Sequence, residues 1–198
     1  MEKPPPRRDI ILEAAIRVFG QSGYRKTSVD DLAEAAQISK QGLYLHFSSK
    51  EEVFRAALQK YLDDRLALVE KMLTAPRISL FHRLLAALDS WFGEHLTTFT
   101  PQSFDVIEAG TRLSEPHMDR YKLEMQSKLA TALADSAEFE RVGHICSPRE
   151  VAQVLLLCGL TWKEGHPSRV EFVRKMGLCI QACCQVGPSQ HPRREKRP

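Results

Sequence analysis

The chain has 198 residues, of which 43% are hydrophobic and 27% charged, and its formal net charge is +3. This length is sufficient for a small domain plus a larger one, or for one compact unit. No apolar run approaches the roughly 18 residues that a membrane-spanning helix needs, and residues 1–6 lack the apolar core of a signal peptide, so we expect a cytoplasmic protein without a membrane partner.

The first predicted helix covers residues 10–19. Its apolar residues recur at the i, i+1, i+4, i+5, i+8, i+9 spacing of one wide helical stripe. They are Ile10, Ile11, Ala14, Ala15, Val18 and Phe19. Gly23 follows as a stop signal, so the helix is predicted to end before it.

The next stretch, residues 27–50, reads TSVDDLAEAAQISKQGLYLHFSSK and has the layout of two helices joined by a turn. Ser28 is placed to cap the first helix, with Asp31 completing a capping box, and Ser39 offers a cap to a second helix over residues 40–46. In the second helix Leu43 and Phe47 are spaced to pack inward. A helix of about two turns is not stable alone in water, so its neighbours must hold it in place.

The side chains left on the outer face of this short helix suit DNA bases and phosphates. They are Lys40, Gln41, Gly42, Tyr44 and His46. The pattern therefore favours a helix-turn-helix DNA-binding segment. The alternative is an ordinary helical hairpin whose polar side is merely solvated.

The rest of the chain is predicted to be helical, with no strand pattern. Ser49 and Glu52 indicate a second capping box, and Pro76, Pro101, Pro148 and Pro167 mark breaks between helices. The expected helices cover residues 49–73, 81–99, 103–113, 115–137, 148–164 and 168–186, with a loop over residues 139–147. The prediction is an all-α protein of about nine helices.

The motifs of the first quarter of the chain together resemble those of the tetracycline-repressor (TetR) family. The matching residues are Gly23, Tyr24, Thr27–Val29, Asp31–Ala33, Ile38–Lys40, Gly42–Tyr44, His46, Phe47 and Ser49–Glu51. One departure is Gln37, which stands in the turn where the family usually has glycine. A non-glycine residue there is expected to adopt a left-handed conformation at a modest cost.

The resemblance implies a three-helix helix-turn-helix domain over residues 1–48 and a helical regulatory and dimerisation domain over residues 49–187. It implies a transcriptional regulator, and in this family most often a repressor, which leaves its double-stranded DNA operator when an unknown small-molecule effector binds. The short helix would enter the major groove, with Lys40 and Gln41 reaching base edges. The full set expected to contact DNA is Thr27, Ser28, Ser39, Lys40, Gln41, Gly42, Tyr44, His46 and Lys50.

The last two predicted helices are expected to form a homodimer, as the resemblance implies for the family. Both carry apolar stripes, and the small residues Ala152 and Gly159 would allow close approach. A twofold dimer reads two half-sites about 34–36 Å or a multiple of this distance apart, whereas one head contacts few base pairs. The alternative is that these helices cover only the core of their own chain.

The middle helices combine aromatic bulk with a few polar groups, as small-molecule cavities do. The predicted ligand-binding residues are Trp91, His95, Phe99, Phe104, Glu108, Arg112 and Trp162. The alternative is that the aromatic residues form core and that Glu108 and Arg112, at i, i+4, make a surface ion pair.

The five cysteines are an odd number and do not form a secreted disulfide framework. Cys179 and Cys183 share one side of a predicted helix, and they could serve a thiol-redox or metal-responsive regulator together with His144 and Cys146. Cysteine also fills helix interfaces as a small hydrophobic residue, which is the favoured interpretation. No catalytic arrangement or phosphate loop is present, so neither an enzyme nor a cofactor is expected.

The excess positive charge lies at the end of the chain. Residues 188–198 contain Arg193, Arg194, Lys196 and Arg197 against Glu195, which accounts for the whole net charge. This proline-rich basic tail is predicted to be disordered. DNA binding would then depend on a small patch of the helix-turn-helix segment.

Overall fold

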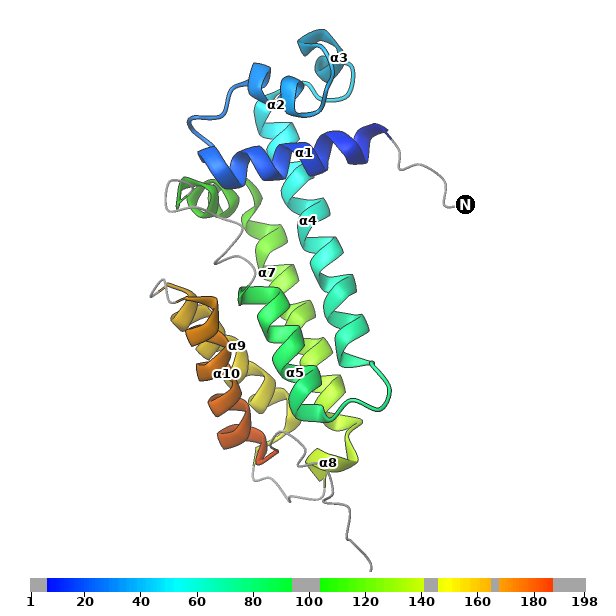
Figure 1. Cartoon of the computed structure of the whole chain (residues 1–198), viewed down its shortest axis with the longest axis vertical. Helices are drawn as coiled ribbons and strands as arrows, with labels where there is room; N and C mark the ends of the chain where they lie inside the picture. The colour runs from blue at the N-terminus through cyan, green and yellow to red at the C-terminus, as the bar shows by residue number, and fades with distance from the viewer. Residues whose placement is uncertain (1–6, 94–103, 141–145, 165–167, 187–198) are drawn as a thin grey trace, which may run out of the picture. The chain divides into compact units, whose positions relative to one another are not determined.

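The computed structural model describes residues 7–93, 104–140, 146–164 and 168–186, and these are helical apart from short connections (Figure 1). Over these ranges the chain forms ten helical elements and no strand, so the all-α prediction is confirmed. Within the same ranges, no helix is both long enough and apolar enough to cross a bilayer.

The chain divides into two compact units. Unit 1 comprises residues 1–67 and 94–124, and unit 2 comprises residues 68–93 and 125–198. Two long helices, α4 (Lys50–Leu73) and α7 (Phe104–Ala134), each contribute residues to both units. The boundaries predicted from the sequence after residues 48 and 187 remain predictions.

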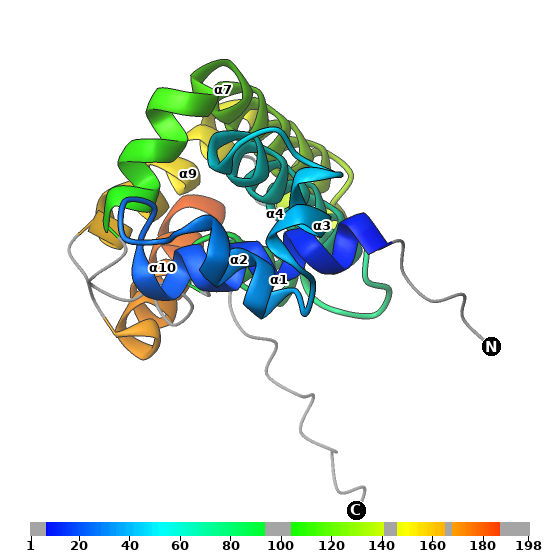
Figure 2. The same ribbon diagram turned by 90° about the horizontal axis from the view of Figure 1, so that it is seen from above.

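Unit 1 contains α1 (Arg7–Ser22), α2 (Val29–Ala35), α3 (Lys40–Tyr44) and the first parts of α4 and α7. Figure 2 shows α1, α2 and α3 close together, as seen from above. The ring of Phe54 on α4 packs edge-on against Phe19 and Tyr24, with ring centroids 5.1 and 4.9 Å apart. All three side chains are buried, so this aromatic cluster attaches α1 to α4.

The predicted caps of the two short helices are confirmed. The Ser28 hydroxyl accepts the Asp31 N–H at 3.1 Å, and the Asp31 carboxylate accepts the Ser28 N–H at 2.8 Å. The Ser39 hydroxyl accepts the Gly42 N–H at 3.0 Å. Side chains thus satisfy backbone donors that an isolated short helix would leave to water.

The capping box predicted for α4 is only half correct. The Ser49 hydroxyl accepts the Glu52 N–H at 3.1 Å, as expected. The Glu52 carboxylate, however, accepts the N–H and the hydroxyl of Ser48, both at 2.6 Å. By bonding Ser48 instead of Ser49, the Glu52 carboxylate accepts two hydrogen bonds instead of one. These bonds lower the pKa of Glu52.

The turn between α2 and α3 has the left-handed residue that the sequence predicts. Gln37 has φ 55°. Its N–H donates to the Glu34 carbonyl at 2.9 Å, and the Ile38 N–H donates to the Ala33 carbonyl at 3.0 Å. This is the Schellman arrangement, in which glycine is the usual left-handed residue because it has no Cβ.

Unit 2 contains α5 (Leu80–Leu88), the π-helical turn η1 (Asp89–Gly93), α8 (Ala137–Glu140), α9 (Pro148–Glu164), α10 (Arg169–Cys184) and the ends of α4 and α7. Arg169, at the start of α10, makes two hydrogen bonds to the Asp89 carboxylate, at 3.0 and 2.7 Å. A Cβ atom at Gly159 would overlap the Phe92 ring. The small size of Gly159 therefore serves packing within its own chain.

Two predicted boundaries are wrong. The expected separate helices over residues 103–113 and 115–137 are one helix, α7, which continues through residue 116. Proline lacks the N–H that would bond the preceding turn. The helix, however, has buried side chains both before this position, at Val106 and Ala109, and after it, at Tyr121 and Met125. Tertiary packing thus outweighs the local break signal.

Other differences are smaller. The helix predicted over residues 81–99 changes to a π-helical turn at Asp89, and its continuation from residue 94 lies outside the described residues. The predicted loop over residues 139–147 begins inside the short helix α8. Each difference concerns a boundary, and none changes the helical fold class.

Replacing Gln37 by glycine should raise the free energy of unfolding by about 0.5–1 kcal/mol, because glycine adopts a positive φ without the Cβ penalty. Urea unfolding of the full chain measures the change. As a control, Gln41→Gly places glycine inside α3 and should lower stability by about 0.5–1 kcal/mol. A less stable Gln37→Gly variant would contradict the strain argument.

Candidate nucleic-acid interface

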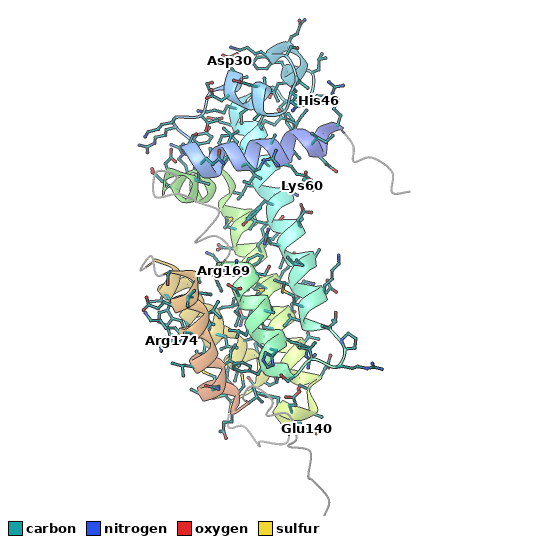
Figure 3. All side chains as sticks on the ribbon, in the orientation of Figure 1. Asp30, His46, Lys60, Glu140, Arg169 and Arg174 are labelled. Atoms are coloured by element: carbon teal, nitrogen blue, oxygen red, sulfur yellow. The ribbon has the colours of Figure 1, made fainter. Side chains whose placement is uncertain are left out.

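The short helix α3 presents an apolar side to the protein and a polar side to solvent. Leu43 and Phe47 are buried, with 1% and 2% of their surface exposed. Residues 40, 41, 44 and 46 are exposed, and residue 42 is partly exposed. The inward and outward positions are those that the sequence predicts, and Figure 3 shows His46 on the outside of this segment.

Leu45 was not among the predicted contacts, although 82% of its surface is exposed. It is the C-cap of α3 and stands between two exposed predicted residues, Tyr44 and His46. In the sequence, residues 43, 45 and 47 are all apolar, so their pattern does not indicate that residue 45 is exposed. Only the helical geometry separates Leu45 from its two buried neighbours.

Lys40, at the first position of α3, is held by an acidic residue of α2. Its ammonium donates to the Asp30 carboxylate at 2.9 Å, and this bond raises the pKa of Lys40. Both side chains are more than half exposed, so the ion pair adds little stability. It restricts the Lys40 side chain at the position where it would meet a base edge.

Two residues of the set expected to contact DNA make contacts within the protein. The Thr27 side chain is 1% exposed, and its hydroxyl donates to the Gly23 carbonyl at 2.6 Å. The Lys50 ammonium donates to the Tyr24 and Thr27 carbonyls at 3.0 and 2.9 Å, and it lies 4.6 Å from the centroid of the Tyr24 ring. Both side chains hold the connection between α1 and α2, and a contact of either with DNA stays a prediction.

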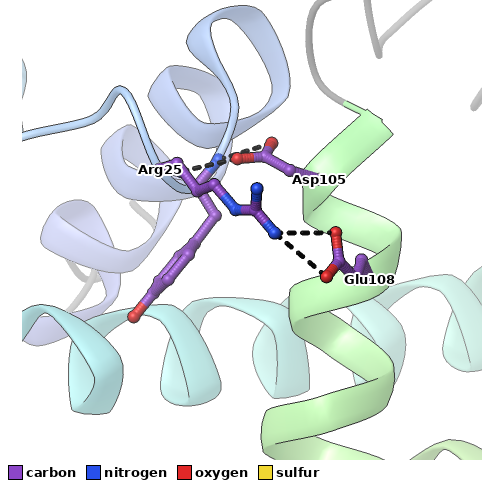
Figure 4. Close-up of polar contacts among 4 residues, drawn as sticks. Arg25, Asp105 and Glu108 are labelled. Carbon is purple, nitrogen blue, oxygen red and sulfur yellow. Dashed lines mark hydrogen bonds and ion pairs between the residues drawn. The ribbon is translucent and has the colours of Figure 1, made fainter.

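We call residues 23–28, which connect α1 to α2, the corner. Figure 4 shows how α7 reaches it. The two oxygens of the Asp105 carboxylate accept the N–H groups of Tyr24 and Arg25 at 2.9 and 2.6 Å. The Arg25 guanidinium donates to both oxygens of Glu108 at 3.0 and 3.1 Å.

The corner is therefore held from two directions within unit 1. α7 binds its N–H donors through Asp105, and α4 binds its carbonyl acceptors through Lys50. Hydrogen bonds to charged groups contribute about 1.5–3 kcal/mol each. The Arg25–Glu108 pair is 68% and 62% exposed, and such pairs contribute about 0–1 kcal/mol. Asp105 is thus the stronger of the two α7 contacts.

The sequence did not predict this contact. Local spacing suggested a pair between Glu108 and Arg112, but the partner of Glu108 is Arg25, 83 positions away. Such pairs have no signal in one sequence. Because Asp105 and Glu108 are three residues apart on α7, they face the same side, which is consistent with their joint role.

The other predicted ligand-binding residues are dispersed. Trp91 is buried in η1 with 8% of its surface exposed, and Trp162 is partly exposed on α9, both in unit 2. Arg112 is exposed on α7, in unit 1. His95 and Phe99 lie outside the described residues, as does the side chain of Phe104. The ligand site stays a prediction.

The cysteines favour the structural interpretation. The sulfur atoms of Cys179 and Cys183 are 3.9 Å apart on α10, and burial raises the pKa of the Cys179 thiol. The thiolate is the form that reacts with oxidants and binds metals, so a raised pKa disfavours both roles. Across the described ranges, no three His, Cys, Asp or Glu side chains gather as a metal site would need. His144 lies outside these ranges, and Cys146 is an exposed free cysteine.

Comparison with known proteins gives one family match. The sequence profile described as "Bacterial regulatory proteins, tetR family" matches residues 11–57, which cover α2, α3, most of α1 and the start of α4. The HTH-type transcriptional activator FasR of Mycolicibacterium smegmatis is 33% identical over 138 residues, which are 69% of this chain and 58% of FasR. The match thus spans less than two thirds of the length of that relative.

A second relative is covered more completely. The HTH-type transcriptional regulator YfiR of Bacillus subtilis, described as uncharacterized, is 32% identical over 149 residues, which are 71% of this chain and 72% of YfiR. Among solved structures, the reduced form of Escherichia coli NemR superimposes with a TM-score of 0.71 at 19% identity, covering 93% of this chain and 100% of that one. At this identity the likeness shows a shared fold.

Replacing Asp105 by asparagine should lower the free energy of unfolding by about 1–2 kcal/mol, because an amide offers one acceptor oxygen to the two N–H groups of the corner. Arg25→Gln is the matched control, since it removes the guanidinium that binds Glu108 but keeps the backbone N–H that binds Asp105. It should cost less than about 1 kcal/mol. Equal losses in urea unfolding would contradict the dominant role of Asp105.

Proposed function

Because the chain belongs to the TetR family of bacterial regulatory proteins, we propose that it is a homodimeric, sequence-specific DNA-binding repressor that a small-molecule effector releases from its operator. The observation that supports the proposal most strongly is that α3 is held in place by its neighbours while its polar side chains face solvent. Five residues cannot form a stable helix alone, yet α3 is capped, buried through Leu43 and presented to solvent on its polar side.

The chemistry of the exposed side chains supports base reading at the start of α3 and backbone contacts around it. Lys40 and Gln41 occupy its first two positions, where the recognition helix of a helix-turn-helix meets base edges. Ser28, Tyr44 and His46 are exposed nearby and carry groups that bind phosphate oxygens. We propose that the first pair reads sequence and that the second set fixes the register.

An exposed apolar strip on the last two helices supports dimerisation through them. Val154 and Leu157 of α9 are 43% and 54% exposed, and Leu178 of α10 is 54% exposed. Their neighbours Leu155 and Ile180 are fully buried in unit 2. The two helices thus cover their own core with one side and keep apolar side chains on another, which is typical of a contact surface.

The corner supports a mechanism for effector response. Asp105 on α7 and Lys50 on α4 hold the residues that lead into α2, and both helices also contribute residues to unit 2. An effector that displaces either helix would change how α2 and α3 are held. By linkage, DNA and effector would then weaken each other's binding, typically by about 1–3 kcal/mol.

The direction of regulation is part of the proposal, because FasR is described as an activator. A reporter gene placed behind a selected operator tests it. Repression requires that reporter expression falls when the intact protein is produced. Increased expression would show activation while leaving DNA binding intact.

Lys40→Ala and Gln41→Ala should each change which bases a selected operator prefers, because a lost base contact typically costs about 1–3 kcal/mol at one position. Selection from a random duplex library measures the preference. Gln59→Ala, on an exposed position of α4, is the control and should leave it unchanged. Unchanged preferences in both α3 variants would remove these residues from base reading.

The double variant Leu157→Glu, Leu178→Glu should be monomeric, because it places charges within an apolar contact between copies. Sedimentation of the intact chain measures the mass. Leu123→Glu on α7 is the matched control, since Leu123 is 61% exposed and lies outside α9 and α10. Dimerisation of the double variant would place the dimer contact elsewhere.

A further inference from the structure

The structure leaves one end of α3 without an assigned cation. Lys40 stands at the beginning of α3, but the Lys50 ammonium, which belongs to the set expected to contact DNA, donates to the Tyr24 and Thr27 carbonyls. Protein affinity for a duplex depends on cations that neutralise phosphates and release counterions. A phosphate contact beside the end of α3 near His46 would therefore come from a cation of another element.

Arg8 on α1 supplies a cation at this place. Its guanidinium carbon lies 4.9 Å from the centroid of the Phe47 ring, and Phe47 directly follows His46. The Phe47 side chain is 2% exposed, whereas Arg8 is exposed. Figures 1 and 2 both show α3 beside the first half of α1. The guanidinium thus rests on a fixed aromatic surface next to the reading segment.

The stacked position leaves the hydrogen-bond donors of Arg8 available. A guanidinium on an aromatic face keeps its five N–H groups at its edge, in the geometry that suits phosphate oxygens. The positive charge of Arg8 helps to lower the pKa of Glu52, and that carboxylate already accepts two hydrogen bonds from Ser48. Over the described part of the chain, Arg8 forms no ion pair with Glu52.

The position of Arg8 suits a contact with the border of the groove. Lys40 begins α3, and Arg8 lies beside the other end, over the Phe47 ring. The major groove is about 12 Å wide and is bordered by phosphates on both sides. A cation beside the end of α3 can bind one of these borders while Lys40 and Gln41 face the bases.

We propose that Arg8 is a DNA-backbone contact that fixes the His46 end of α3 in the groove. This inference rests on the proposed DNA-binding function. It assigns to α1 a direct part in binding, in addition to its structural support of α2 and α3. The contact is to phosphate, so it contributes affinity and register without selecting bases.

The test measures binding of the intact chain to its selected operator and to an unrelated duplex at several salt concentrations. Arg8→Gln should weaken binding to both duplexes and reduce the slope of log affinity against log salt by about one. Base preference and melting temperature should not change. Arg8→Lys keeps the charge and should keep the slope. Arg17→Gln, an exposed arginine further along α1, is the matched control and should leave the slope unchanged.

Three results would overturn the proposal. An unchanged slope in Arg8→Gln would show that Arg8 does not bind phosphate, and a lower melting temperature without a slope change would show a purely structural role. A changed preference for bases flanking the half-site would show that Arg8 reads a groove edge instead. Failure of the proposed function is distinguishable, because the unmodified protein would then select no duplex at all.

Discussion

The backbone of residues 24–27 is held by charged side chains from two different helices, and the position of α2 and α3 depends on this. Asp105 of α7 takes the N–H groups of Tyr24 and Arg25, and Lys50 of α4 takes the carbonyls of Tyr24 and Thr27. A carboxylate from one helix thus binds N–H donors of this short segment, and an ammonium from another helix binds its carbonyl acceptors. Loss of either charge would leave polar backbone groups in a partly buried place, where such groups are costly.

The constraint matters because α3 has little stability of its own. It is five residues long, and it is held by the Ser39 cap, by buried Leu43 and by the Schellman turn at Gln37. The Schellman turn closes the end of α2, α3 packs against α2, and α2 begins directly after the corner. The position of α3 is therefore linked to α4 and α7 through Lys50 and Asp105.

The helices α9 and α10 carry apolar residues on two different sides. Gly159 is small because the Phe92 ring lies against it, so it serves the core of unit 2. Val154, Leu157 and Leu178 serve no core and are exposed. On α10, burial raises the pKa of the Cys179 and Cys184 thiols, which favours packing over thiol chemistry for these two cysteines.

The sequence by itself determined the local features: the caps at Ser28 and Ser39, the left-handed Gln37, the inward positions of Leu43 and Phe47, and the helical class. These depend on residues within about four positions of each other, where spacing alone carries the information. Only the tertiary structure decided that α7 continues past residue 116, that Glu108 binds Arg25 and that Lys50 faces the corner. The partners of Glu108 and Lys50 are far away in the sequence, so residue spacing could not reveal these contacts. In α7, the burial of the helix outweighs the local break signal at residue 116, so helix propensity could not predict its continuation.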